Sequence, residues 1–188
     1  TVSKTENLVK RGAKLLTEIK DAPLNADVVF TMVGYPKDVE GVYLGNDGLI
    51  TTAKEGQVFV DMTTSSPTIA KKISEEFAKV GASALDLPVT GGDIGAKNGT
   101  LSIMVGGDKK DYEEKVLPLV KHLGKNITYF GEAGKGQYAK LANQIAIATT
   151  MISVAESFKF AKEVGLDLED FFKTVSTGSG GSFSMTSY

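Results

Sequence analysis

The sequence contains no cysteine and no tryptophan, and His122 is its single histidine. Without cysteine the chain can form neither disulfides nor thiolate metal sites, and one histidine cannot build a histidine-based cluster, so we expect no metal site. The formal net charge is only −2, without a basic stripe, which argues against a nucleic-acid partner. No stretch of about eighteen apolar residues is free of polar interruption, so we expect no membrane association. With no signal peptide recognised, we expect a cytoplasmic protein.

Short runs rich in β-branched residues alternate with helical patterns up to Phe130. We expect helices at 38–44, 68–80 and 111–123, and strands at 27–32, 57–62, 84–89, 101–105 and 126–130. Strands that alternate with helices of this length predict βαβ units and an α/β fold with a mostly parallel sheet.

The pattern changes after this region, because residues 136–164 form one long helical pattern. It is too apolar for a helix surrounded by water and too polar for a membrane span. We therefore expect a buried helix where two domains join. A shorter helix at 168–175 follows, with Asp167 as its N-cap.

Three segments follow expected strands and should lie at one edge of the sheet. They are Val33–Gly34, Thr63–Thr64 and Thr90–Gly92. Ligands of such sheets bind outside the carboxyl ends of the strands. We therefore expect a binding crevice at this edge.

The sequence DLPVTGGDIGAKNGTLSIMVGG, residues 86–107, places two apolar runs on either side of a glycine-rich loop. Hairpin connections usually need only about two to five residues, and this one is roughly twice as long. Glycine lets the backbone approach another surface closely, including a ligand. We therefore expect the loop to contact a ligand.

Gly134, Gly136 and Ala139 spell GxGxxA between a strand and a helix. A dinucleotide fingerprint also needs a compact βαβ unit with an acidic residue after its second strand, and here the long helix leaves no room for that strand. We therefore reject a pyrophosphate site. We expect the glycines to form a sharp corner and to bring the helix start close to a ligand.

Lys140, Asn143 and Gln144 are spaced i, i+3 and i+4 on the long helix, so they share one face. Lys140 is either a surface lysine with a packed stem, or a partly desolvated amine that exchanges a proton with a substrate hydroxyl. In the second case Asn143 could hold the same oxygen. The spacing alone does not decide between these alternatives.

Three motifs together resemble the β-hydroxyacid dehydrogenases, the family of 3-hydroxyisobutyrate dehydrogenase and tartronate semialdehyde reductase, which is related to 6-phosphogluconate dehydrogenase. Residues 86–107 resemble its substrate loop. GKGQYAKLANQ, residues 134–144, resembles its catalytic-lysine signature. VDMTTSSP, residues 60–67, resembles the segment that ends beside the nicotinamide. The motifs have the family's order and spacing, and the resemblance covers essentially the whole chain.

The resemblance implies hydride transfer between a small β-hydroxyacid and NAD or NADP, with Lys140 as the general acid/base and Asn143 orienting the reacting oxygen. Backbone N–H groups of the glycine turn would hold the substrate carboxylate. The implied substrate-binding residues are Thr90, Gly91, Gly92, Asn143 and Gln144. The implied cofactor-binding residues are Val33, Gly34, Asp38 and Thr64. The family often has Leu-Pro where this chain has Val33–Gly34.

The resemblance also implies a Rossmann-like, doubly wound domain followed by an all-α domain. Residues 1–132 would be a partial NAD(P)-binding domain, and residues 133–188 the start of the C-terminal helical domain, with a long interdomain helix. The N-terminal strands with their glycine-rich loop and the last helices would be missing, so this chain alone would be inactive. We expect a homo-oligomer, a dimer or tetramer. The alternative is a truncated, non-catalytic module that associates through its long helix.

Overall fold

The computed structural model describes residues 4–187, so the first three residues and the last residue of the expected domains lie outside it. The chain forms two compact units that divide after Lys140, inside the long helix.

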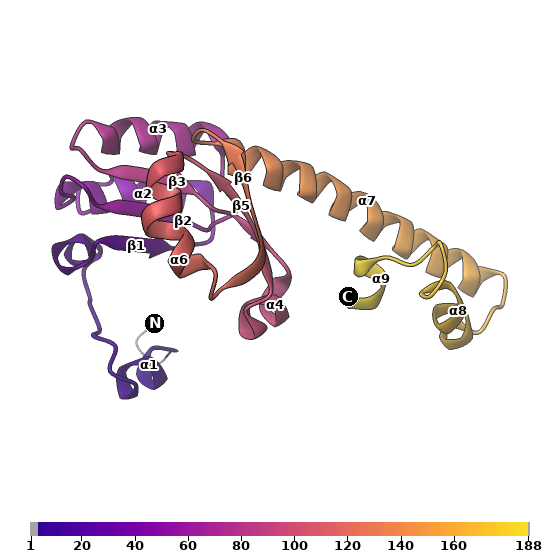
Figure 1. The fold of residues 1–188 in the computed structure, drawn as a ribbon. Coiled ribbons are helices and arrows are strands. Elements are labelled where there is room, and N and C mark those ends of the chain that lie inside the picture. Colours follow the sequence, from indigo (N-terminus) through magenta and orange to yellow (C-terminus); the bar gives the residue numbers. More distant parts are fainter. Residues whose placement is uncertain (1–3, 188) are drawn as a thin grey trace. The chain divides into compact units, whose positions relative to one another are not determined.

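The first unit is built on a six-stranded sheet with the order β1-β2-β3-β5-β4, in which β6 also pairs with β5 (Figure 1). Its strands are β1 (Val28–Thr31), β2 (Val58–Asp61), β3 (Ser83–Asp86), β4 (Val89–Thr90), β5 (Leu101–Gly106) and β6 (Gly124–Gly131). β1, β2 and β3 are parallel to one another, as β5 and β6 are to each other. β5 runs antiparallel to β3 and β4. The α/β class with a mainly parallel sheet is confirmed.

β3 and β4 are two parts of one interrupted strand. Asp86 pairs with Gly106 and Val89 with Ile103, so both parts keep the same register against β5. Pro88 lies between them and has no N–H to donate. Its carbonyl still accepts the N–H of Met104 at 3.0 Å. The predicted strand at 84–89 is therefore present, with a break that its proline explains.

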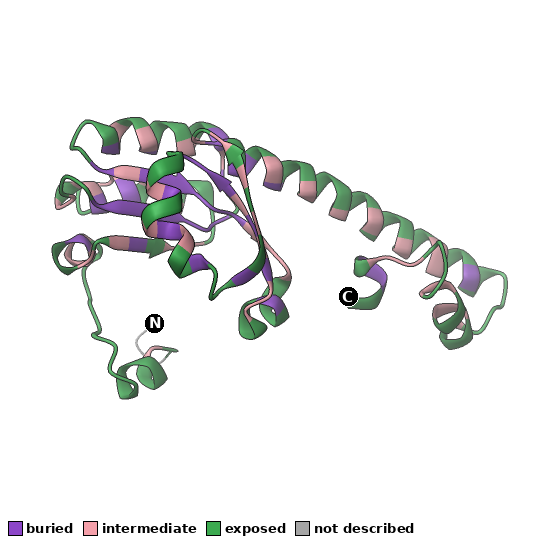
Figure 2. Cartoon of the chain, in the orientation of Figure 1, coloured by how far each residue is buried: buried purple, intermediate pink, exposed green. Residues whose placement is uncertain are grey.

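Helices cover both faces of this sheet. α2 (Pro36–Leu44), η3 (Leu49–Thr51) and α3 (Pro67–Ala78) pack on one face. η4 (Tyr112–Val116) and α6 (Leu117–Val120), which follow α5 (Lys109–Asp111), pack on the other. Along β2, Phe59 packs edge-on against Phe77 of α3, with ring centres 4.6 Å apart, whereas Val58 and Val60 join the opposite core. The central strands are accordingly buried on both sides (Figure 2). Packing on both faces holds the central strands, and with them their carboxyl ends, in place.

The predicted single helix at 111–123 is wrong in detail. The segment consists of α5, the π-helical turn η4, and α6. Pro118, early in α6, cannot donate to a carbonyl one turn back, and its ring crowds that turn. A widened π turn accommodates this defect.

The predicted glycine-rich loop is also wrong, because residues Gly92–Asn98 form a helix, α4. Gly91 precedes it with φ +125°, and Gly99 ends it in the left-handed conformation. Gly95 is buried against β5, where an added Cβ would lie 3.1 Å from the Leu101 side chain. Several of these glycines therefore shape and pack a short helix.

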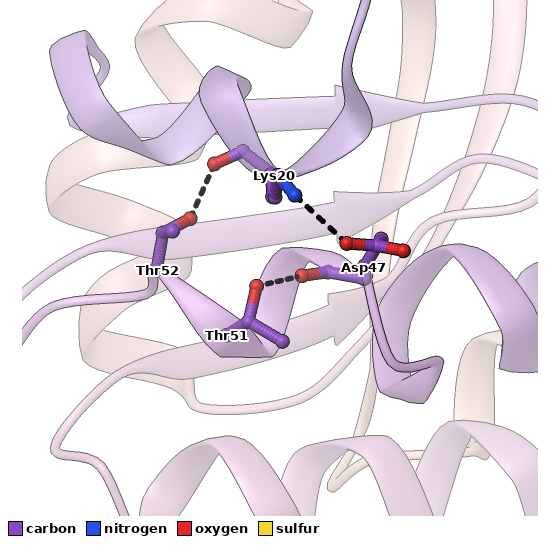
Figure 3. Close-up of polar contacts among 5 residues, drawn as sticks. Lys20, Asp47, Thr51 and Thr52 are labelled. Carbon is purple, nitrogen blue, oxygen red and sulfur yellow. Dashed lines mark hydrogen bonds and ion pairs between the residues drawn. The ribbon is translucent and has the colours of Figure 1, made fainter.

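The N-terminal segment contains α1 (Glu6–Lys10) and η2 (Ile19–Asn25). η2 is tied to the loops around η3 (Figure 3). Lys20 pairs with Asp47 at 2.8 Å, and the Thr52 hydroxyl donates to the Lys20 carbonyl. Deeper in the unit, the Gln57 amide donates to the Pro23 carbonyl at 2.6 Å. These contacts hold η2 against the loops around η3 and against Gln57, just before β2.

The second unit contains most of α7 (Lys135–Glu163), with α8 (Leu168–Val175) and α9 (Phe183–Ser187). The side chain of Asp167 accepts the N–H of Asp170 at 2.9 Å, which confirms the predicted cap of α8. Phe158 of α7 packs edge-on against Phe171 of α8. Of residues 141–163, Ala161 alone is buried, so the prediction of a buried long helix is wrong for this part of α7. No helix in the described part of the chain is long and apolar enough to cross a membrane.

Candidate functional site

The structure joins two of the three segments expected at the carboxyl edge of the sheet. The N–H of Val33, after β1, donates to the Thr63 hydroxyl, after β2, at 2.9 Å. The N–H of Thr63 in turn donates to Asp61 at 3.0 Å. Thr63 is buried, whereas the neighbouring Thr64 and Gly34 are exposed. Thr64 is therefore available to a ligand at this edge.

Gln137, in the first turn of α7, fastens that helix to the loop after β2. Its side-chain oxygen accepts the N–H of Ser65 at 2.8 Å, and its amide nitrogen donates to the Thr63 carbonyl at 2.7 Å. The side chain is completely buried, with an exposed fraction of 0%. The sequence pattern alone predicts no role for this residue.

Asp86, at the end of β3, is a second residue that sequence analysis missed. Its two carboxylate oxygens accept the N–H groups of Gly134 and Gln137, each at 2.7 Å. The residue is 2% exposed, and burial raises the pKa of its carboxyl to about 6, with a smaller contribution from Asp61 on the adjacent strand. The signal for Asp86 in the sequence is an acidic residue at the end of an otherwise apolar strand.

Gly134 and Gly136 form the expected sharp corner, and Gly134 has φ +88°. A Cβ on Gly136 would lie 2.5 Å from the carbonyl oxygens of both Asp86 and Met104. The start of α7 thus presses on the backbone of the sheet. Protein backbone fills the space beside Gly136, and the predicted approach of the helix start to a ligand stays a prediction.

Lys140 follows Gln137 by three residues and is 6% exposed, so it is not an exposed surface lysine. No described residue forms an ion pair or hydrogen bond with its ammonium group. Burial lowers its pKa, because an ammonium loses hydration there. A larger neutral fraction suits an amine that exchanges protons.

Asn143 and Gln144 lie on the same helix, after the boundary between the units. The Asn143 side-chain oxygen is buried and has no hydrogen-bond partner among the described residues. Gln144 is exposed. The helix is continuous from Lys140 to Gln144, so the expected spacing along one face is present.

Thr90, Gly91 and Gly92 form the turn that leads from β4 into α4. Gly91 and Gly92 both have positive φ, +125° and +64°. The first N–H groups of a helix have no partner within it, so this turn carries donors suited to an anion. Among the described residues, no hydrogen bond links the turn to Lys140.

Asp38 is engaged within its own helix. Its side chain accepts the N–H of Tyr35 at 3.0 Å and so caps α2. Its expected contact with a cofactor stays a prediction, as do the expected contacts of Val33, Gly34 and Thr64.

The edge has the properties of a site for a polar ligand. The Ser65 hydroxyl is buried and has no partner among the described residues. Such an orphaned group next to the exposed Thr64 fits the hydrogen-bonding end of a nicotinamide cofactor. A separate groove of about 690 Å³, between α3 and the ends of β5 and β6, contains none of the expected site residues.

Two family models match the chain. The NAD binding domain of 6-phosphogluconate dehydrogenase matches residues 1–131, and the NAD-binding domain of NADP-dependent 3-hydroxyisobutyrate dehydrogenase matches residues 134–188. NAD or NADP is therefore the cofactor of the family.

Three similar proteins show how far the likeness extends. An uncharacterised oxidoreductase of Bacillus subtilis is 50% identical over 186 residues, covering 99% of this chain and 64% of that protein. A probable 3-hydroxyisobutyrate dehydrogenase-like mitochondrial protein of Arabidopsis thaliana is 43% identical over 189 residues, covering 100% of this chain and 56% of that protein. The solved 3-hydroxyisobutyrate dehydrogenase of Mycobacterium tuberculosis, with L-serine, has a TM-score of 0.84 at 28% identity, covering 100% of this chain and 63% of that one.

This chain thus spans 56% to 64% of the lengths of these three proteins. Both matched domains, together with the motifs at the sheet edge and at the start of α7, lead to one assignment. The chain belongs to the β-hydroxyacid dehydrogenase family.

Proposed function

We propose that the polypeptide carrying this chain is an NAD(P)-dependent dehydrogenase of a small β-hydroxyacid, such as 3-hydroxyisobutyrate, with Lys140 as its general acid/base. The observation that carries this proposal is that Lys140 is only 6% exposed and has no ion-pair or hydrogen-bond partner among the described residues, one helical turn beyond Gln137, which is bonded to the sheet edge. Structural lysines usually reach solvent or pair with an acid.

In the oxidation direction, the neutral amine of Lys140 accepts the proton of the substrate hydroxyl. In the reduction direction, its ammonium returns that proton to the carbonyl oxygen. The nicotinamide, when bound, supplies the hydride acceptor or donor. The lowered pKa of Lys140 makes both protonation states accessible nearer to neutral pH than for an exposed lysine.

The remaining site residues bind the substrate and the cofactor and orient them for the reaction. Asn143, whose side-chain oxygen has no partner among the described residues, orients the reacting oxygen of the substrate, and Gln144 contacts the substrate beside it. Backbone N–H groups of Thr90–Gly92 hold the carboxylate. Val33, Gly34, Thr64 and, more distantly, Asp38 contact the cofactor.

The test is steady-state kinetics on the complete polypeptide that carries this chain, with a panel of β-hydroxyacids and both NAD and NADP. The wild type should oxidise at least one acid, and Lys140→Ala should lose about 10²- to 10⁴-fold in kcat. Lys135→Ala is the matched control, because Lys135 is an exposed lysine of the same helix. Equal rates for Lys140→Ala and the wild type would refute the acid/base role.

An interaction module is the second candidate, because α7 carries exposed apolar residues in the second unit. Ile145, Ile152 and Phe160 are 71%, 61% and 65% exposed. Turnover of the wild type separates the two candidates, since a module would show none with or without the lysine, and sedimentation then measures association. The homo-oligomer stays a prediction that the same measurement tests.

A further inference from the structure

The N-terminus of α7 is capped by a residue from a distant strand. Gly134 immediately precedes the helix and has no side chain with which to cap it. Asp86, on β3, supplies the missing acceptor, because its carboxylate accepts hydrogen bonds from the N–H groups of Gly134 and Gln137. A carboxylate at this position also interacts favourably with the positive end of the helix dipole.

A second pair of hydrogen bonds ties the same turn to the loop after β2. Gln137 bonds both the N–H of Ser65 and the carbonyl of Thr63, in the loop after β2. The first turn of α7 is therefore held by two neighbouring strand ends, and Lys140 follows it by one turn of rigid helix.

We propose that Asp86 is a positioning residue, whose carboxylate sets the place of Lys140 by fixing the first turn of α7 on the sheet edge. This inference rests on the proposed function of Lys140. It assigns to Asp86 no contact with substrate or cofactor.

The positioning requires an ionised carboxylate. Two N–H donors need two acceptor oxygens, and a protonated carboxyl presents an O–H to one of them. The charged side chain that acts on Asp86 is Asp61 of β2. On β5, the residue next to the Asp86 carboxylate is the uncharged Gly106. On α3, Lys71 lies against Gly134. The carboxyl has a pKa of about 6, so the cap weakens below that pH.

The first experiment compares Asp86→Asn with the wild type in the complete polypeptide. Asparagine keeps the size of the side chain but turns an NH₂ group toward one of the two donors. We expect kcat to fall about 10- to 100-fold with little change in KM, as for a misplaced catalytic group. The acid limb of the kcat profile near pH 6 should disappear.

Asp111→Asn is the matched control, because Asp111 bonds Ser83 at the opposite end of β3 and pairs with Lys115. It should keep the wild-type kcat and pH profile. If Asp86→Asn keeps both as well, while Lys140→Ala is inactive, the positioning role is wrong and the proposed function stands. If Lys140→Ala is fully active, the proposed function itself is refuted, whatever the result for Asp86→Asn.

A second measurement needs no variant and so does not depend on its folding. In the ¹⁵N-labelled wild-type protein, the amide protons of Gly134 and Gln137 should titrate together, with one midpoint near pH 6. Because both donate to the same carboxylate, a shared midpoint is the expected signature. A change at only one of the two amides, or two separate midpoints, would show that the two N–H groups do not share this carboxylate and would overturn the proposal.

Discussion

A Cβ atom built on Gly106, the last residue of β5, would lie 2.6 Å from the backbone nitrogen of Gly136 in α7. The two backbones touch, and no side chain fits between them. The helix that carries Lys140 therefore starts against the sheet itself, at the point where Asp86 and Gln137 hold it.

The first prediction concerns this contact. Gly136→Ala should destabilise the protein by about 1–3 kcal/mol, because the new methyl group meets two carbonyl oxygens. Gly41→Ala is the control, since a Cβ there meets nothing within 4 Å and the residue lies inside α2. It should stabilise by about 0.5–1 kcal/mol. Denaturant unfolding of both variants measures the difference, and a neutral Gly136→Ala would contradict the close packing.

The second prediction concerns the turn before α4. Gly91→Val should raise KM for the hydroxyacid strongly, because φ +125° is strained for valine and its side chain hinders approach to the N–H groups. Thr90→Ala should change KM only mildly, since only the backbone of Thr90 is expected to bind the substrate carboxylate. Steady-state kinetics on both variants is the measurement. Equal damage from the two changes would point to the Thr90 hydroxyl instead.

The third prediction concerns pH and stability. The folded protein binds a proton on Asp86 more tightly than the unfolded chain, because the pKa of this carboxyl is raised from 3.8 to about 6. Its contribution to the free energy of unfolding is therefore present at low pH and is lost as pH rises from about 4 to about 6. A shift of about two units corresponds to about 3 kcal/mol.

Unfolding curves at several pH values, for the wild type and Asp86→Asn, check this sign. The difference between the two profiles should change across this window, because Asn has no titrating group. Parallel profiles would show that Asp86 does not titrate with a raised pKa.

The sequence predicted the parts of the fold that depend on local pattern. A short apolar run rich in β-branched residues placed β2, and the spacing of apolar residues placed α3 and nearly all of α7. Glycine content was misleading at α4, where Gly95 is part of the helix and is buried close to Leu101 of β5. Pro118 indicated a break in the helix at 111–123, but the amphipathic pattern of that segment favoured one continuous helix.

The site was predicted only where a motif carried it. Val33 and Thr63 come together as expected from parallel strand ends. Asp86 and Gln137 were missed, since their roles depend on groups far away in sequence, 48 and 72 residues from their partners. Burial of Lys140 likewise results from the packing of α7 on the sheet, which spacing along one helix cannot reveal.

The acid/base role of Lys140 is the central claim, and Lys140→Arg tests it most directly. Arginine keeps the positive charge and much of the length but does not deprotonate near neutral pH. We predict a kcat lowered by about 10²- to 10⁴-fold in steady-state assays of the complete polypeptide, with Lys135→Arg unchanged. A Lys140→Arg enzyme with a near-normal kcat would contradict the claim and leave Lys140 as an electrostatic anchor.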